Sequence, residues 1–102
     1  MSAPPFDLYL SDEAKKTLLD LQQPAYRAKY KKVTKALRLL EEQGPRYPAP
    51  SSHLMQSMKG PGGETLWESY VENDTPSAWR MFWVHGPNAD AITVVAIGPH
   101  PD

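Results

Sequence analysis

The apolar positions of this chain follow two different periods, and the first half is mainly helical. Alternation at residues 6–10 predicts a short strand, after which Ser11 offers an N-cap and apolar residues recur at helical spacing up to Leu21. Pro24 ends this helix or opens the next one. In the second helix, residues 26, 30, 33, 37 and 40 form one apolar stripe that stops before Gly44 and Pro45. So tight a connection predicts an antiparallel helical hairpin.

The second half of the chain changes to a period of two, which indicates strands. The expected strands are Leu54–Lys59, Leu66–Glu72, Ala78–His85 and Ala91–Gly98. Their connectors are short, which predicts an antiparallel meander. The whole order, β-α-α-β-β-β(-β), predicts an α+β fold in which the two-helix hairpin packs on one face of an antiparallel sheet.

The expected strand at residues 79–85 is apolar on both faces. Its odd positions carry tryptophan and methionine, and its even positions carry phenylalanine and valine beside Arg80. A central strand that is covered on both sides has this pattern. Because the helices cover only one face of the sheet, we expect the other face to meet a loop, a tail or a partner.

Length and composition narrow the class of protein. The 102 residues are enough for a single domain, 1–102, and 40% hydrophobic with 23% charged residues is typical of a globular chain. The absence of cysteine excludes disulfides, thiolate metal sites and cysteine nucleophiles. Without a long apolar run or a basic, apolar start, we expect a soluble cytoplasmic protein that does not enter a membrane.

The net charge of −1 hides an asymmetry between the two halves. Residues 1–50 carry nine Lys/Arg against six Asp/Glu, a balance of +3, whereas residues 51–102 carry two against six, a balance of −4. Lys31, Lys35 and Arg38 belong to a cationic stripe on the second helix. This stripe is either a solvated face or a docking surface for phosphate backbone or an acidic partner. The tyrosines at 26 and 30 are expected to anchor the core.

Arg80 is the first candidate for chemistry, because it lies within an apolar strand. A guanidinium buried there needs a partner, and the preceding strand offers Glu68 and Glu72. The alternative is that Arg80 points into a cleft and binds an anion. The sequence does not fix the register of the hairpin, so both interpretations stay open.

Further candidates lie around the meander. His100 follows the last strand, which a meander would bring near Arg80, although a tail histidine is often unremarkable. His53, Lys59 and Glu64 flank the first strand of the meander and its glycine-rich turn, which lacks the residues of a phosphate-binding P-loop. The irregular spacing of the histidines predicts no metal site. A plain hairpin turn explains this segment equally well.

Several segments of the chain resemble the RelE/ParE superfamily, the toxins of type II toxin–antitoxin systems. The order of strand, basic helical hairpin and meander is similar over nearly the whole length. The segments that carry the resemblance are Met58-Lys59-Gly60, the stretch at residues 67–73, Thr75-Pro76, Trp79-Arg80 and Ile97-Gly98-Pro99-His100. The resemblance implies the RelE-like fold and an antitoxin as partner.

The RelE-like branch implies a ribosome-dependent mRNA endonuclease that inhibits translation and needs no metal or cofactor. The ribose 2′-OH would attack the neighbouring phosphate, which requires a base, a cation and an acid. Carried over to this sequence, Arg80 would stabilise the transition state, His100 would be the acid and Glu64 or Glu68 the base. Lys59 would hold phosphate, with His53 as an outside candidate.

Two other functions fit the same pattern. A RelE-fold module without nuclease activity could bind an antitoxin-like peptide or form a homodimer, because the strand that is apolar on both faces offers a surface. A toxin directed at gyrase, as in the ParE branch, is implied by the fold alone. The sequence does not decide between these alternatives.

Overall fold

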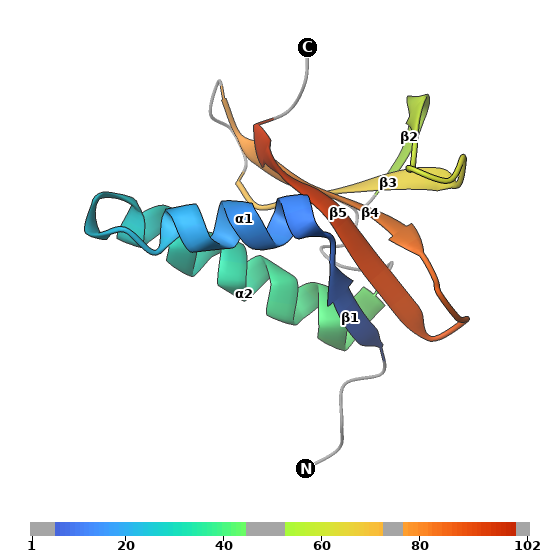
Figure 1. Ribbon diagram of the computed structural model, residues 1–102, viewed down its shortest axis with the longest axis horizontal. Coiled ribbons are helices and arrows are strands. Elements are labelled where there is room, and N and C mark those ends of the chain that lie inside the picture. The colour runs from blue at the N-terminus through green and yellow to red at the C-terminus, as the bar shows by residue number, and fades with distance from the viewer. Residues whose placement is uncertain (1–5, 45–52, 73–76, 100–102) are drawn as a thin grey trace.

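The computed structural model describes residues 6–44, 53–72 and 77–99 (Figure 1). The described elements follow the order β1-α1-η1-α2-β2-β3-β4-β5, where η1 is a single 3₁₀ turn. Their bounds are β1 Asp7–Leu10, α1 Asp12–Leu21, η1 Pro24–Tyr26, α2 Arg27–Gln43, β2 His53–Lys59, β3 Thr65–Tyr70, β4 Trp79–His85 and β5 Ala91–Pro99. Every predicted element is therefore present, with ends shifted by one or two residues.

Ser11 joins the first strand to the first helix. Its hydroxyl accepts a hydrogen bond from the backbone N–H of Ala14 at 3.1 Å, which is the predicted N-cap. The same hydroxyl donates to the carbonyl of Val95 at 2.7 Å, and the Ser11 N–H donates to the carbonyl of Val94 at 2.9 Å. One residue thus starts α1 and fixes that start to the middle of β5.

The five strands form one sheet in the order β1-β5-β4-β3-β2. The antiparallel meander predicted for β2 to β5 is confirmed. The sheet as a whole is mixed rather than antiparallel, because β1 pairs in parallel with β5, from Asp7 opposite Ala91 to Leu10 opposite Val94. The helical hairpin between β1 and β5 makes this parallel arrangement possible, since it returns the chain to the far side of the sheet.

A β-bulge interrupts the pairing of β4 with β5. Phe82 lies opposite Ala96 and Trp83 lies opposite Val94, so Val95 is an extra residue in β5. Ile92 and Val94 pack on the helical side with Ile97, whereas Val95 and Ala96 both pack on the other side. The bulge therefore shifts the alternation of β5 by one position.

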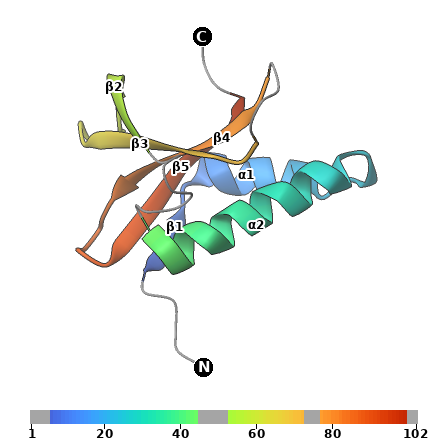
Figure 2. The same ribbon diagram turned by 180° about the vertical axis from the view of Figure 1, so that it is seen from behind.

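The helical hairpin covers one face of the sheet, as predicted (Figures 1 and 2). Its buried residues meet the buried residues of β4 and β5 in a single core. The fully or nearly buried members of this core are Ala14, Leu21, Val33, Ala36, Leu37, Leu40, Met81, Trp83, Ile92, Val94 and Ile97. The apolar stripe of α2 and the odd positions of β4 thus form the main core.

Tyr26 does not anchor the core, contrary to our expectation. It lies in η1, where the hairpin turns beyond the edge of the sheet, and it is 50% exposed. Tyr30, one turn further along, packs against the core as predicted. The apolar stripe therefore starts to be buried only where α2 reaches the sheet.

Gly44 ends α2 and lies against the start of the first strand. Its φ is +60°, a value that side chains disfavour, and a Cβ atom at this position would overlap the ring of Phe6. The glycine predicted to stop the helix therefore also makes room for Phe6. No helix within the described ranges is long and apolar enough to cross a membrane.

Candidate functional site

The second face of the sheet has its own small apolar cluster. Met55, Leu66, Phe82 and Val84 are buried there, and Val95 and Ala96 pack against them. The prediction that β4 is apolar on both faces is therefore confirmed. We call this side the helix-free face, because α1 and α2 lie on the other side of the sheet (Figure 2).

The turn between β2 and β3 comes close to the helix-free face. A Cβ atom on Gly60 would lie 2.6 Å from Cγ1 of Val84 and 2.9 Å from Oε1 of Glu64. Only a glycine permits this approach without displacing a neighbour. The β2–β3 hairpin thus covers part of the sheet that the helices leave uncovered.

Arg80 lies on the helix-free face in a fixed orientation. Its register partner is Tyr70, and its guanidinium carbon lies 3.9 Å from the centre of the Tyr70 ring. Nη1 donates a hydrogen bond to the backbone carbonyl of Glu72 at 3.1 Å, and Nε lies 3.7 Å from Oε1 of Glu68. These three contacts hold one face and two edges of the guanidinium, and the side chain stays 15% exposed.

The ion pair between Arg80 and Glu68 is one of the alternatives that the sequence left open. Glu68 is only 1% exposed, so its charge is compensated by the nearby guanidinium. The other alternative, an anion site, would need a phosphate to approach a cation that already has a carboxylate beside it. Glu68 therefore has the position of a counter-ion to Arg80.

The carboxylate of Glu72, the second glutamate considered for Arg80, binds elsewhere. Oε1 accepts hydrogen bonds from Lys29 at 2.6 Å and from the N–H of Trp79 at 3.2 Å, while Oε2 accepts one from Lys32 at 3.1 Å. Burial on its own would raise the pKa of Glu72, but the bonds from Lys29, Lys32 and Trp79 outweigh it and hold the pKa below its ordinary value. Glu72 therefore ties α2 to the ends of β3 and β4.

The clamp at Glu72 was missed by the sequence analysis. Lys29 and Lys32 lie three positions apart on α2, so they share one side of the helix, but they fall outside the predicted cationic stripe. Lys29 also lies over the Trp79 ring, with its ammonium 5.0 Å from the ring centre. The i,i+3 spacing was the available signal, although it does not name the acidic partner.

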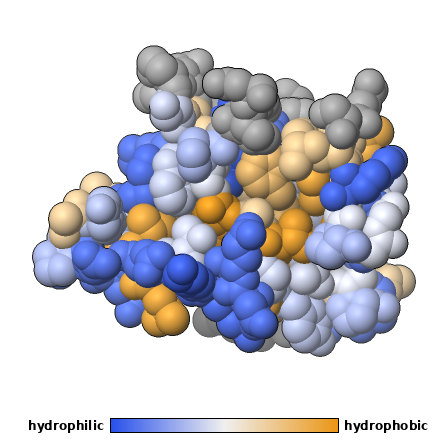
Figure 3. All heavy atoms as spheres, turned by 45° about the horizontal axis from the view of Figure 1, so that its top comes forward, coloured by the Kyte–Doolittle hydropathy of each residue, from blue (hydrophilic) through white to orange (hydrophobic). Residues whose placement is uncertain are grey.

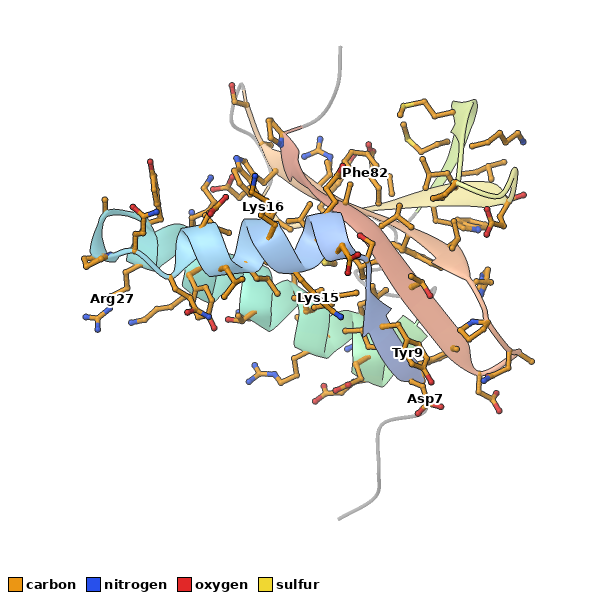
Figure 4. The ribbon with its side chains drawn as sticks, in the orientation of Figure 1. Asp7, Tyr9, Lys15, Lys16, Arg27 and Phe82 are labelled. Carbon is orange, nitrogen blue, oxygen red and sulfur yellow. The ribbon has the colours of Figure 1, made fainter. Side chains whose placement is uncertain are left out.

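A groove of about 480 Å³ opens beside Arg80 on the helix-free face. Its floor includes Gly98, which lies opposite Arg80 in the sheet, and a Cβ atom on Gly98 would have no neighbour within 4 Å. Phe82 and Leu66 form apolar walls, and Lys59 lies at the rim. Figure 4 shows Phe82 beside β5, on the part of that strand that runs toward its C-terminal end. The missing side chain at position 98 is what keeps this space open next to the guanidinium.

Lys59 and Glu64 lie at the two ends of the glycine-rich turn, as a plain hairpin requires. Gly63 donates a hydrogen bond to the carbonyl of Gly60 at 3.0 Å, and Gly60 donates to the carbonyl of Glu64 at 2.8 Å. The carboxylate of Glu64 accepts a bond from the N–H of Gly62 at 2.6 Å. Lys59 is exposed toward the groove, whereas Glu64 stabilises the turn.

The two histidines of the expected site are not described in full. His100 lies outside the described residues. The structure places only the backbone of His53, which pairs with Glu68 across β2 and β3. The acid expected from His100 therefore stays a prediction, and His53 is placed only by its position in the sheet.

The basic residues of α2 are not part of the groove. Lys31, Lys35 and Arg38 are exposed on a helix that packs on the opposite face of the sheet from Arg80. Figure 4 shows Arg27, a member of the same stripe, at the far end of the hairpin from Phe82. The structure therefore separates these residues from Arg80 and Lys59, and one RNA strand would have to pass around the sheet edge to reach both. Among the described residues, no three of the His, Asp and Glu side chains gather as a metal site would require.

Comparisons with known proteins agree with this architecture. Neither the protein-family models nor the curated proteins give a match. Solved structures do match: the YoeB dimer from Staphylococcus aureus has a TM-score of 0.65 at 12% identity, covering 95% of this chain and 99% of that one. YafQ in the E. coli DinJ–YafQ toxin–antitoxin complex has a TM-score of 0.63 at 20% identity, with coverage of 94% and 93%.

An archaeal structure gives the same result. RelE in the RelE–RelB complex from Pyrococcus horikoshii has a TM-score of 0.62 at 14% identity and covers 93% of this chain and 94% of its own. At such low identity a likeness of this kind is a statement about architecture, and it extends over almost the full length of both chains. The predicted fold is therefore confirmed, and the chain has the fold of the RelE/ParE superfamily toxins.

Proposed function

We propose that this protein is the toxin of a type II toxin–antitoxin pair and acts in the cytoplasm as a metal-independent, ribosome-dependent mRNA endonuclease. The observation that carries the proposal is the guanidinium of Arg80, which is held in one orientation beside an open groove with Lys59 at its rim. The shared fold with RelE, YoeB and YafQ supports the same assignment.

The proposed reaction breaks one bond to phosphorus and forms another. The 2′-oxygen bonds to the adjacent phosphorus, its proton passes to a base, and the bond from phosphorus to the 5′-oxygen breaks. The products are a 2′,3′-cyclic phosphate and a 5′-hydroxyl that receives a proton from the acid. Arg80 would stabilise the negative charge that builds up on the phosphate oxygens.

The other roles follow from the positions of the side chains. His100 is proposed as the acid and Lys59 as the phosphate-binding cation. Glu68 is next to Arg80 but deeply buried, and Glu64 is bonded to the turn, so neither carboxylate reaches substrate without a change in its contacts. The proposal therefore keeps the base open between Glu64 and Glu68.

The partners of the matched structures suggest the partners of this chain. The matched RelE, YafQ and YoeB structures include complexes with RelB, DinJ and YefM. We therefore propose a protein antitoxin as the main partner, with the ribosome and its mRNA as the target.

Induced expression in bacteria tests the proposal directly. We expect translation to stop and new transcript ends with cyclic phosphate to appear. Arg80→Ala should lower cleavage by about 10²-fold or more, as for the loss of a charge-stabilising donor. Lys35→Ala on α2 is the matched control and should cleave like the wild type, since it lies away from the groove.

Two results would reject the nuclease. One is normal growth with intact transcripts in cells that contain the folded wild-type protein. The other is full cleavage by a folded Arg80→Ala variant. DNA damage without transcript cleavage would instead favour a gyrase-directed toxin.

A second function, a binding module without nuclease activity, is favoured by one observation. Arg80 is already compensated by Glu68, so the free protein offers a phosphate less charge than an unpaired arginine would. Capture of a defined antitoxin peptide or formation of a homodimer, with no RNA cleavage, would support this alternative.

A further inference from the structure

Strand β5 extends well beyond its neighbour β1. The parallel pairing with β1 ends at Val94, and Ser11 then binds the carbonyls of Val94 and Val95 as the chain turns into α1. The rest of β5, from Ala96 to Pro99, pairs with β4 on its other side. Within the described part of the chain, no strand lies along the outer edge of Ala96–Pro99.

An edge of this kind has hydrogen-bonding capacity. In an antiparallel pair, every second residue turns its N–H and C=O away from the neighbouring strand. Such outward groups are a template for an added strand unless the protein covers them. Here α1 starts at the edge but leads away from it, so the upper end of β5 projects past the helix (Figure 1).

A groove lies on each side of this edge. The groove beside Arg80 has about 480 Å³, and a second groove of about 570 Å³ lies on the helical side, between α1, Tyr26 and Trp79. Ile97, Gly98 and Pro99 line both of them. Figure 3, which turns this end of the molecule forward, shows apolar surface in the middle and hydrophilic residues around it.

The two grooves match the geometry of a strand. Successive side chains of a strand point to opposite faces, so a strand added at Ala96–Pro99 would place one side chain in each groove. Each volume is large enough for a leucine or a phenylalanine side chain. Main-chain bonds would then supply affinity and the two grooves specificity, as in other cases of strand addition.

Charge at the rims points to the kind of segment. Glu13 lines the first groove and Asp20 the second. The ammonium of Lys29 in the second groove is already bound by Glu72 at 2.6 Å, so Asp20 dominates there. Together with the balance of −4 in residues 51–102, these rims favour a basic segment and disfavour a nucleic acid.

We propose that the outer edge of Ala96–Pro99 accepts an extended segment of a partner protein as a sixth strand of the sheet. The segment carries two successive apolar side chains, one for each groove, with basic residues beside them. The inference specifies how a protein partner docks, and it does not depend on RNA cleavage.

A synthetic peptide tests this inference with the full chain. The probe is an acetylated, amidated hexapeptide, Lys-Thr-Leu-Phe-Thr-Lys, and its control has N-methyl groups at the leucine and the phenylalanine, which removes two backbone donors. We expect hydrogen exchange to slow at the outward amides of Ala96–Gly98 when the peptide is added at millimolar concentration. N-methylation should weaken binding by tenfold or more.

Protein variants separate the two grooves from the backbone edge. Gly98→Leu fills the first groove without a clash and should weaken the peptide by tenfold or more, since a Cβ there has no neighbour within 4 Å. Asp20→Lys should weaken it through the second groove. Lys35→Ala on α2 is the control and should bind normally.

Four results would overturn the proposal. They are unchanged exchange at Ala96–Gly98 at millimolar peptide, equal binding of the N-methylated peptide, slower exchange at these amides with an RNA oligonucleotide instead, and a homodimer in solution that Gly98→Leu dissociates. The last result would mean that a second copy of the chain occupies the edge. Each readout is independent of transcript cleavage, so the nuclease proposal can fail while this one stands.

Discussion

The backbone carbonyl of Glu72 accepts a hydrogen bond from Nη1 of Arg80 at 3.1 Å. The carboxylate of the same residue binds Lys29 and Lys32 on α2. Glu72 therefore connects the guanidinium on one face of the sheet with the helix on the other. The orientation of Arg80 depends on a residue that would make no contact with a bound phosphate.

Glu72→Gln should destabilise the fold without changing its architecture. The amide keeps part of the hydrogen bonding but loses the charge that pairs with both lysines. Because Lys32 is largely exposed, we expect a loss of only about 1–2 kcal/mol, measured by urea unfolding. Glu42→Gln, at an exposed position on α2, is the control and should lie within about 0.5 kcal/mol of the wild type.

The lowered pKa of Glu72 predicts a defined dependence of stability on pH. A carboxyl whose pKa is lower in the folded state than in the unfolded state, where it is about 4.3, adds stability at neutral pH. That contribution falls away as the pH drops through the folded-state value. The stability difference between wild type and Glu72→Gln should therefore shrink below about pH 4. A difference that stays constant or grows on acidification would contradict this assignment.

Arg80 is expected to support the fold as well as any activity. Arg80→Met leaves the carboxylate of Glu68 buried beside an apolar side chain, and we expect a loss of about 2–4 kcal/mol in the free energy of unfolding. The double variant Arg80→Met/Glu68→Leu removes both charges and should recover much of this loss. If the two single changes were additive instead, the ion pair would have no energetic weight. Activity tests on Arg80 variants therefore need a parallel measurement of folding.

Gly60→Ala should strain the turn between β2 and β3. The new methyl group would lie 2.6 Å from Cγ1 of Val84, inside van der Waals contact, so the hairpin must lift from the sheet. We expect a loss of about 1–3 kcal/mol, as for other overpacked sites. Gly98→Ala is the matched control, because the same methyl group there meets open space, and it should be tolerated. Equal losses at both positions would show that the close approach at Gly60 is unimportant.

Local signals account for most of the fold that could be predicted. The alternation at residues 6–10, the N-cap at Ser11 and the stripe of α2 each act over a few residues, so the sequence contains them directly. The parallel pairing of Asp7 with Ala91 joins residues 84 positions apart, and no local pattern encodes it. Tyr26 was misjudged for a similar reason, since the periodicity of a helix does not show where the sheet beneath it ends.

The candidate site divides in the same way. Arg80 was identified because a charge in an apolar strand is unusual at any register. The choice between Glu68 and Glu72 needed the register that places Tyr70 opposite Arg80. The contacts of Glu72 with Lys29 and Lys32 needed the packing of α2 against the sheet, which is a tertiary feature.

The extra residue in β5 affects how this chain should be compared with others. Without the bulge at Val95, simple alternation from Ile92 and Val94 would turn Gly98 toward the helices and Ile97 toward Arg80. An ungapped alignment to a regular strand would therefore equate the glycine beside the guanidinium with a core position. Evolutionary comparisons across this strand should allow a one-residue insertion before asking which lineages keep position 98 small.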